Sequence, residues 1–194
     1  MKEIIFASHN KGKIAEIRQI LTPFGINVKS SDEIDFPDVE ETGTTFEENA
    51  LIKAEAIAKL KGIPCLADDS GLCVKALNGR PGVYSARYAP NRDFDKAMDM
   101  LLQEIADSKS SDRGAHFACV LVLAYPDGTY KSFEGRVDGS IALEKSGVGG
   151  FGFDPVFMPN GYDKTFAELG SEIKNKISHR GRALEKFVKY LEAL

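Results

Sequence analysis

A short apolar run that stops at two adjacent carboxylates constrains this chain more than any other feature. The run covers residues 63–67 and is followed by Asp68, Asp69, Ser70 and Gly71. We interpret it as a buried strand, after which the chain turns at Gly71 and leaves both acids at the strand's carboxyl end. Open α/β sheets place their ligands at that edge. The stretch predicts an α/β fold with an active site beside the acids, although Asp, Ser and Gly also suit an ordinary turn.

The two acids need not share one role, because neighbouring side chains of a strand point to opposite faces. One carboxylate could hold a metal ion while the other orients or deprotonates a water molecule.

Size and charge limit the classes of function. A chain of 194 residues with 43% hydrophobic content can bury one core, so we expect a single domain over residues 1–194. The net charge of -4 argues against a nucleic-acid partner, which normally requires a basic surface. An anionic partner should therefore be small and bound by local cations.

Three cysteines bear on the cellular compartment. Cys65, Cys73 and Cys119 lack CxxC spacing and lie inside apolar runs, which is typical of reduced core residues. The first apolar run is too short for a signal peptide, and no stretch reaches membrane-spanning length. We expect a cytoplasmic protein without a membrane partner.

The segment between the first strand, residues 4–7, and the first helix, which continues to Leu21, is a candidate phosphate site. It consists of Ser8, His9, Asn10, Lys11, Gly12 and Lys13. A strand-loop-helix junction offers backbone N–H groups and the positive end of a helix dipole, and this one adds a hydroxyl, an amide and two ammonium groups. It does not match GxxxxGK[ST], and an ordinary polar loop is an equal alternative.

An acidic loop precedes the second helix. Asp38, Glu40 and Glu41 lie in this loop and could complete a Mg²⁺ site with the acid pair, or they could form a solvated face. The helix at 45–61 opens with two candidate capping boxes, at Thr44 and Thr45, and ends at Gly62.

The apolar side of this helix includes two polar residues. Its members are Phe46, Ala50, Ile57 and Leu60, with Asn49 and Lys53 among them. Lys53 could extend to water, or its ammonium could reach a buried anion.

The second half of the chain predicts a helix at 94–105 and two strands, 115–125 and 129–137, joined by a turn, so the sheet should be mixed. The stretch 147–152 matches GxGxxG, but Pro155 follows it closely, which excludes the start of a helix and a dinucleotide fingerprint. A loop that brings backbone and Phe151 to a flat ligand fits better, and a tight turn filled by Phe151 and Phe153 is the alternative.

Arg180 begins the last helix on its buried face, after the candidate N-cap Ser178. It could hold an anion or a carbonyl oxygen, or form a salt bridge to Asp154 or Glu168.

Seven motifs together resemble the inosine/xanthosine triphosphate pyrophosphatase family. They occur in order at residues 8–13, 40–43, 46–50, 67–71, 79–87, 149–155 and 178–180. The resemblance covers essentially the whole chain, and its one small departure is Phe153, where relatives often carry tyrosine. It implies a long mixed β-sheet flanked by helices, with two lobes around a central active-site cleft, in a homodimer.

The same resemblance implies Mg²⁺-dependent hydrolysis of ITP, dITP and XTP to the monophosphate and pyrophosphate. Asp69 would accept a proton, with Asp68 in support, and Glu40 and Asp69 would bind the metal; the choice between Glu40 and Glu41 stays open. The implied substrate-binding residues are Ser8, His9, Asn10, Lys11, Gly12, Lys13, Lys53, Ser70, Phe151, Gly152, Phe153, Asp154, Lys176, His179 and Arg180.

Two alternatives remain at this point. One is a Maf-like pyrophosphatase acting on modified pyrimidine nucleotides, which the motifs at 151–154 and 178–180 argue against. The other is a non-catalytic nucleotide sensor, in which we would expect Asp68 and Asp69 to be missing.

Overall fold

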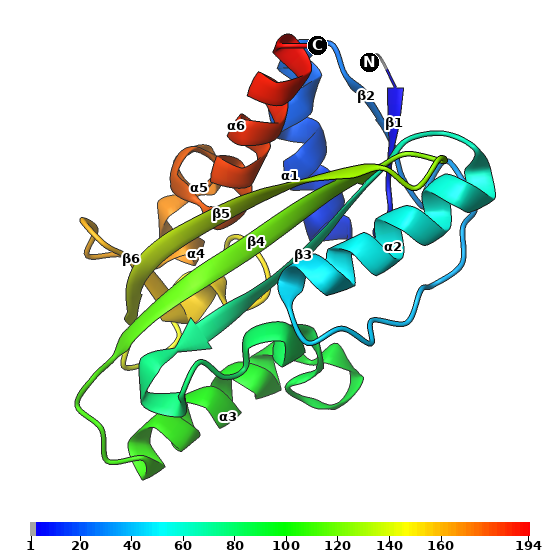
Figure 1. The fold of residues 1–194 in the computed structure, drawn as a ribbon. Helices are drawn as coiled ribbons and strands as arrows, with labels where there is room; N and C mark the ends of the chain where they lie inside the picture. The colour runs from blue at the N-terminus through cyan, green and yellow to red at the C-terminus, as the bar shows by residue number, and fades with distance from the viewer. Residues whose placement is uncertain (1–2) are drawn as a thin grey trace. The chain divides into compact units, whose positions relative to one another are not determined.

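The computed structural model describes residues 3–194, so Met1 and Lys2 lie outside it. Its six strands form one sheet in the order β2-β1-β3-β4-β5-β6 (Figure 1). The strands are β1 Glu3–Phe6, β2 Asn27–Lys29, β3 Cys65–Val74, β4 Gly114–Ala124, β5 Tyr130–Ile141 and β6 Phe157–Pro159. The α-helices are α1 Lys11–Leu21, α2 Phe46–Lys61, α3 Phe94–Asp107, α4 Phe166–Leu169, α5 Ser171–Ile177 and α6 His179–Glu192.

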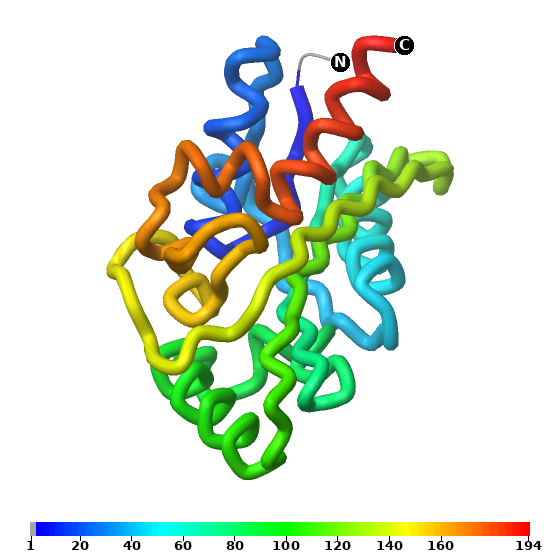
Figure 2. The backbone as a smooth tube through the Cα atoms, turned by 90° about the vertical axis from the view of Figure 1, so that its left-hand side faces the viewer, coloured from blue at the N-terminus to red at the C-terminus, as the bar shows by residue number. Residues whose placement is uncertain are grey.

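The sheet is mixed, as the sequence predicts. Strand β1 pairs in parallel with β2 and β3, whereas β5 and β6 pair antiparallel. The chain reverses between β4 and β5 (Figure 2). In this turn the Gly128 N–H donates to the Tyr125 carbonyl. The predicted α/β class is therefore confirmed.

The chain divides into two compact units. Unit 1 comprises residues 1–69, 119–135 and 180–194, and unit 2 comprises residues 70–118 and 136–179. The chain passes from one unit to the other within β3, β4 and β5 and again between α5 and α6. Each unit is therefore assembled from separate stretches of sequence.

Helices cover both faces of the sheet in unit 1. One apolar cluster packs α1 and α6 against Ile4, Phe6 and Leu66, and a second packs α2 against Ile5 and Ala67 (Figure 1). Alternating residues of β1 and β3 thus face opposite helical layers, as expected for strands buried on both sides.

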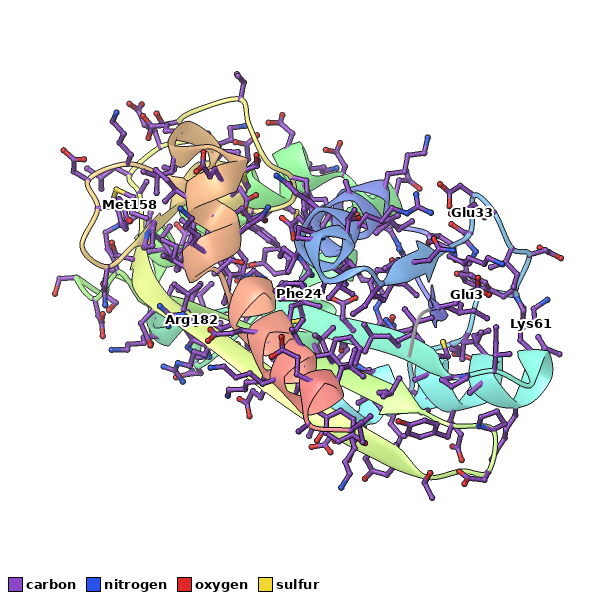
Figure 3. The ribbon with its side chains drawn as sticks, turned by 90° about the horizontal axis from the view of Figure 1, so that it is seen from above. Glu3, Phe24, Glu33, Lys61, Met158 and Arg182 are labelled. Atoms are coloured by element: carbon purple, nitrogen blue, oxygen red, sulfur yellow. The ribbon has the colours of Figure 1, made fainter. Side chains whose placement is uncertain are left out.

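Helix α2 has the boundaries that the sequence predicts. Of the two candidate capping boxes, the one formed by Thr45 and Glu48 is present, and the helix ends at Gly62 with a left-handed backbone. Lys61 lies in its last turn, where a positive charge suits the helix dipole (Figure 3). The placement of Leu60 on the apolar side is wrong, since Leu60 is 58% exposed.

The core of unit 2 lies around α3. Ala97, Met98 and Leu101 of that helix pack with apolar side chains of β3 and of the first part of β4. The predicted helix at 94–105 is confirmed, and Asp93 caps it by accepting a hydrogen bond from the Lys96 N–H.

The predicted turn at Gly71 is wrong, because β3 continues without interruption through Asp68, Asp69 and Gly71 to Val74. Gly71 instead permits a close approach of the 3₁₀-helix Gly82–Arg87. A Cβ at position 71 would collide with the Gly82 carbonyl and would lie 2.7 Å from Ser85 Oγ. The acids therefore lie in the middle of a strand.

The state of the cysteines agrees with the sequence expectation. Cys65, Cys73 and Cys119 are free thiols, two of them buried and Cys73 half-buried. Within residues 3–194, no helix combines the length and the apolar character needed to cross a membrane.

Candidate active site

Asp68 and Asp69 face opposite sides of the sheet in unit 1. Leu66 contacts the layer of α1 and α6, whereas Ala67 contacts the layer of α2. Side chains two residues apart on a strand point to the same face. Asp68 therefore faces the layer of α1 and α6, as Leu66 does, and Asp69 faces the layer of α2, as Ala67 does. Strand β1 ends at Phe6, beside Leu66, so both acids lie beyond the carboxyl end of their parallel neighbour.

Asp68 is fully buried and binds two cations. Its Oδ1 accepts from Lys13 Nζ at 3.2 Å, and its Oδ2 accepts from Arg180 Nε at 3.3 Å and Nη2 at 3.2 Å. Burial alone would raise the pKa of Asp68, but the charges of Lys13, Arg180 and Lys53 lower it well below its usual range. Asp68 is therefore a permanently ionised anchor for the starts of α1 and α6.

Glu16 is a second carboxylate on this side of the sheet. It forms a buried ion pair with Arg180 Nη1. Burial opposes the charge of Arg180, but Glu16 and Asp68 outweigh burial and raise the pKa of the guanidinium. Within unit 1, Arg180 thus binds the carboxylates of Glu16 and Asp68.

Asp69 has the opposite electrostatic balance. Its side chain is 5% exposed, and its Oδ2 accepts from Asn49 Nδ2 at 3.0 Å. Burial raises the pKa of Asp69 to about 6; Lys53 opposes this rise and Glu41 adds to it. A carboxylate whose charge is incompletely compensated, with a pKa near neutrality, is suited to binding a metal ion or accepting a proton.

Lys53 faces inward, which settles the choice between water and a buried anion. Its ammonium donates to the Asp68 carbonyl at 2.6 Å and lies 2.9 Å from Glu41 Oε1. Burial lowers the pKa of Lys53, but the charges of Asp68, Glu41 and Asp69 raise it above its ordinary value. The anions that surround Lys53 in this structure belong to the protein.

The acidic loop contributes one carboxylate to this neighbourhood. Glu41 is half-buried beside Lys53, whereas Glu40 is exposed. Among residues 3–194, no group of three His, Cys, Asp or Glu residues is close enough to hold a metal ion. Two carboxylates suffice for Mg²⁺, which keeps several waters and also binds substrate phosphates. Asp69 and Glu41 fit that requirement by their chemistry.

Residues 8–13 form the predicted strand-loop-helix junction. Asn10 is the N-cap of α1, and its Oδ1 accepts from the Lys13 N–H at 3.1 Å. Ser8 Oγ accepts from the Asn10 N–H at 3.1 Å, and His9 is half-exposed, 3.0 Å from Asp38. Lys11, Gly12 and Lys13 form the first turn of the helix, where N–H groups favour an anion.

The glycine-rich loop at residues 147–152 lies in unit 2, and Asp154 binds its backbone. The buried Asp154 Oδ2 accepts from the Phe151 N–H at 3.0 Å and from Lys174 Nζ at 2.7 Å. Lys174 Nζ also lies 4.3 Å from the centre of the Phe151 ring. The loop does not open an α-helix, which agrees with the rejection of a dinucleotide fingerprint.

The other predicted residues of unit 2 differ in exposure. Phe153 is buried against Phe94, 5.4 Å between ring centres, and His179 stacks on Phe117 at 4.7 Å. Ser70 and Gly152 are half-buried, and Lys176 is exposed.

Comparison with known proteins identifies the family. The sequence profile of the Ham1 family matches residues 4–190, which is nearly the whole chain. This chain belongs to the Ham1 family.

The relatives match this chain over nearly its full length. It is 51% identical to a dITP/XTP pyrophosphatase of Bacillus subtilis, covering 100% of this chain and 98% of that one. It is 48% identical to a dITP/XTP pyrophosphatase of Agrobacterium fabrum, covering 96% and 94%. The resemblance read from the seven motifs is thereby confirmed, and the Maf-like alternative finds no support.

Solved Ham1 structures have the same fold. A HAM1 protein from Coxiella burnetii superposes with a TM-score of 0.92 at 43% identity, covering 100% of both chains. The Ham1 protein of Staphylococcus aureus gives a TM-score of 0.87 at 46% identity, covering 99% of both.

Sequence reasoning missed two charged residues of this Ham1 protein. Glu16 lies three positions after Lys13, on the same face of α1, and this spacing was an available signal. Lys174 is buried against Asp154, whereas the sequence pointed to Lys176 two positions later. No local pattern distinguishes these two lysines, because burial depends on how α5 packs.

Proposed function

We propose that this Ham1-family protein hydrolyses the non-standard purine nucleoside triphosphates ITP, dITP and XTP to the monophosphate and pyrophosphate. This activity would clear them from the cytoplasmic nucleotide pool. The names of the Bacillus and Agrobacterium relatives support the substrate class. The observation that carries the proposal is the acid pair on β3, in which Asp68 binds Lys13 and Arg180 while Asp69 faces the α2 side and binds Asn49.

The triphosphate would be bound by residues 8–13 and by Lys53. The first turn of α1 offers N–H groups and a dipole, and Lys13 and Lys53 bring ammonium groups to the same unit. Phosphoryl transfer depends mainly on such positioning and charge neutralisation. Lys13 and Lys53 now neutralise protein carboxylates, so a substrate would have to share them.

Asp69 and one of Glu40 and Glu41 would hold Mg²⁺, and the half-buried Glu41 is the better placed by its contact with Lys53. When bound, Mg²⁺ would act as a Lewis acid toward phosphate oxygens. Asp69 would also accept the proton of the attacking water. Asp68 would support this by fixing Lys13 and Arg180.

The remaining predicted contacts concern the nucleoside. We propose that Ser70, Phe151, Gly152, Phe153, Asp154, Lys176, His179 and Arg180 contact the nucleotide, as the family resemblance implies. Asp154 and Lys174 support this indirectly, since they hold the backbone of Phe151 in place. We further propose that residues 1–194 act as one functional domain within a homodimer.

One screen tests the proposal. Purified protein is incubated with ITP, dITP, XTP, GTP, ATP and modified pyrimidine triphosphates, with Mg²⁺ or with a chelator, and released pyrophosphate is measured. We expect pyrophosphate from ITP, dITP and XTP only when Mg²⁺ is present. Equal rates with ATP, or release of orthophosphate in place of pyrophosphate, would refute it.

A further inference from the structure

Asn49, in the first turn of α2, is a fully buried polar residue to which the proposed reaction assigns no role. Both ends of its amide are engaged. Its Nδ2 donates to Asp69 Oδ2 at 3.0 Å, and its Oδ1 accepts from the Gly43 N–H at 2.8 Å. Because one partner requires a donor and the other an acceptor, a single orientation of the amide satisfies both.

Gly43 ends the acidic loop that carries Glu40 and Glu41. A Cβ at position 43 would lie 2.8 Å from Asn49 Oδ1 and 2.6 Å from Glu48 Cβ, closer than real Cβ atoms approach their neighbours. Only glycine lets the loop lie this close to α2. The Thr45–Glu48 capping box fixes the start of that helix, so Asn49 is mounted on a rigid element.

We propose that Asn49 is a positioning residue that holds the carboxylate of Asp69 and the end of the acidic loop in one arrangement. It would thereby bring together the two proposed metal ligands, one on β3 and one on the loop, before a metal ion binds. This inference rests on the proposed function, since it concerns the same metal ligands. Residues that orient metal-binding carboxylates in this way typically change metal affinity or activity by roughly 10- to 100-fold when they are lost.

Two variants distinguish the bond from Asn49 to Asp69 from the placement of the acidic loop. Asn49→Leu removes both hydrogen bonds with a side chain of similar size. Gly43→Ala displaces the loop but keeps the Asn49 amide, which can still donate to Asp69. Ala58→Gly is the control, because it weakens the same helix by roughly 1 kcal/mol at a buried site nine residues after Asn49.

The measurements are Mn²⁺ binding to the nucleotide-free protein, followed by electron paramagnetic resonance of the free ion, and kcat and KM for ITP with Mg²⁺. Mn²⁺ serves as the probe because it accepts the same oxygen ligands as Mg²⁺. We expect both variants to bind Mn²⁺ roughly tenfold or more weakly than wild type. At saturating Mg²⁺, Gly43→Ala should recover its kcat and Asn49→Leu should not, with little change in KM.

The proposal is overturned if Asn49→Leu keeps the Mn²⁺ affinity and kcat of wild type. It is also overturned if Ala58→Gly lowers Mn²⁺ affinity and kcat as much as Asn49→Leu does, because Asn49 would then have only a structural role. If Asn49→Leu does not fold, Gly43→Ala decides alone, and undiminished Mn²⁺ affinity in it overturns the proposal. Hydrogen exchange of the wild-type backbone amides gives a test that does not depend on enzyme activity. The Gly43 N–H should be protected by its hydrogen bond to Asn49, and rapid exchange would show that Asn49 does not hold the loop. If wild type does not hydrolyse ITP, the proposed function is wrong. The Mn²⁺ binding and hydrogen-exchange results would still test whether Asn49 positions Asp69 and the loop.

Discussion

Arg180 and Glu16, 164 positions apart in the sequence, form a buried ion pair that joins the start of α6 to the middle of α1. The same guanidinium also binds Asp68 on β3. One arginine therefore ties two helices to the central strand, and its removal would leave two buried carboxylates without their shared cation.

Replacing Arg180 should be strongly destabilising for that reason. We expect Arg180→Ala to lower the free energy of unfolding by about 3–5 kcal/mol, the cost typical of breaking a buried ion pair by removing one partner. The measurement is urea unfolding with comparison of midpoints and m-values. As a control, Arg182→Ala changes an exposed arginine of the same helix and should shift stability by less than about 0.5 kcal/mol (Figure 3). Equal effects of the two variants would contradict the assigned role of the buried pair.

Substitutions at the two adjacent acids should have opposite effects on stability. Asp69→Asn removes a buried charge whose pKa is raised to about 6, so the metal-free protein should gain on the order of 2 kcal/mol at pH 8. Asp68→Asn removes the anion that Lys13 and Arg180 neutralise and should destabilise the protein. Thermal and urea unfolding of both variants tests this. A loss of stability in Asp69→Asn would show that its charge is better compensated than the geometry indicates.

The same Asp69→Asn variant should lose activity while it gains stability. If Asp69 binds Mg²⁺ and accepts a proton, its turnover of ITP should fall by a factor on the order of 10² or more. Binding of ITP should survive, because residues 8–13 and Lys53 are unchanged. Steady-state kinetics with a separate binding measurement tests both parts, and near-normal turnover would remove Asp69 from the mechanism.

The raised pKa of Asp69 also gives a pH dependence of stability with a definite sign. The folded protein holds this proton up to about pH 6, whereas the unfolded chain loses it near pH 4. The contribution of Asp69 is therefore fully present below about pH 4 and is lost as the pH rises through 6. Asp68 acts in the opposite sense, since its lowered pKa stabilises the folded state above about pH 4. The difference in unfolding free energy between wild type and Asp69→Asn, measured from pH 4 to 8 with a chelator, isolates the Asp69 contribution and should widen with pH in favour of the variant. A constant difference would be inconsistent with a raised pKa.

Lys13 should contribute more to triphosphate than to monophosphate binding. Lys13→Ala should weaken ITP binding by roughly tenfold or more, as expected for a lost hydrogen bond from a charged donor, and should affect inosine monophosphate much less. Calorimetric titration of both ligands decides this. Lys59→Ala is the control, because Lys59 is an exposed lysine of α2 outside the residues proposed to bind the triphosphate. Equal losses for both ligands in Lys13→Ala would mean that Lys13 serves only to neutralise Asp68.

The elements that the sequence predicts well are those with local signals. Thr45, Glu48 and Gly62 define α2 through capping chemistry that depends on nearby residues alone. The start of α1 is predicted less well, because Lys11 and Lys13 were expected before the helix and lie in its first turn, which Asn10 caps. The roles of the candidate phosphate contacts at residues 8–13 remain predictions.

The features that the sequence does not reveal depend on contacts between distant residues. Gly71 resembles a turn residue locally, but its lack of a side chain serves the approach of residues 82–85, so β3 continues where a turn was expected. The partners of Arg180 lie on α1 and β3, and no spacing rule connects residues 16, 68 and 180. The burial of Lys174 and the exposure of Lys176 follow from packing of a short helix.

The passage of the chain between the two units inside β3, β4 and β5 has a consequence for its genetic architecture. Neither unit corresponds to one uninterrupted stretch of codons, so no simple truncation can express a unit by itself. Splitting the gene at any single point would divide both units or leave one incomplete. Fragments from limited proteolysis should therefore lack native structure when separated, and neither unit could have been gained or lost by a single end-to-end gene fusion.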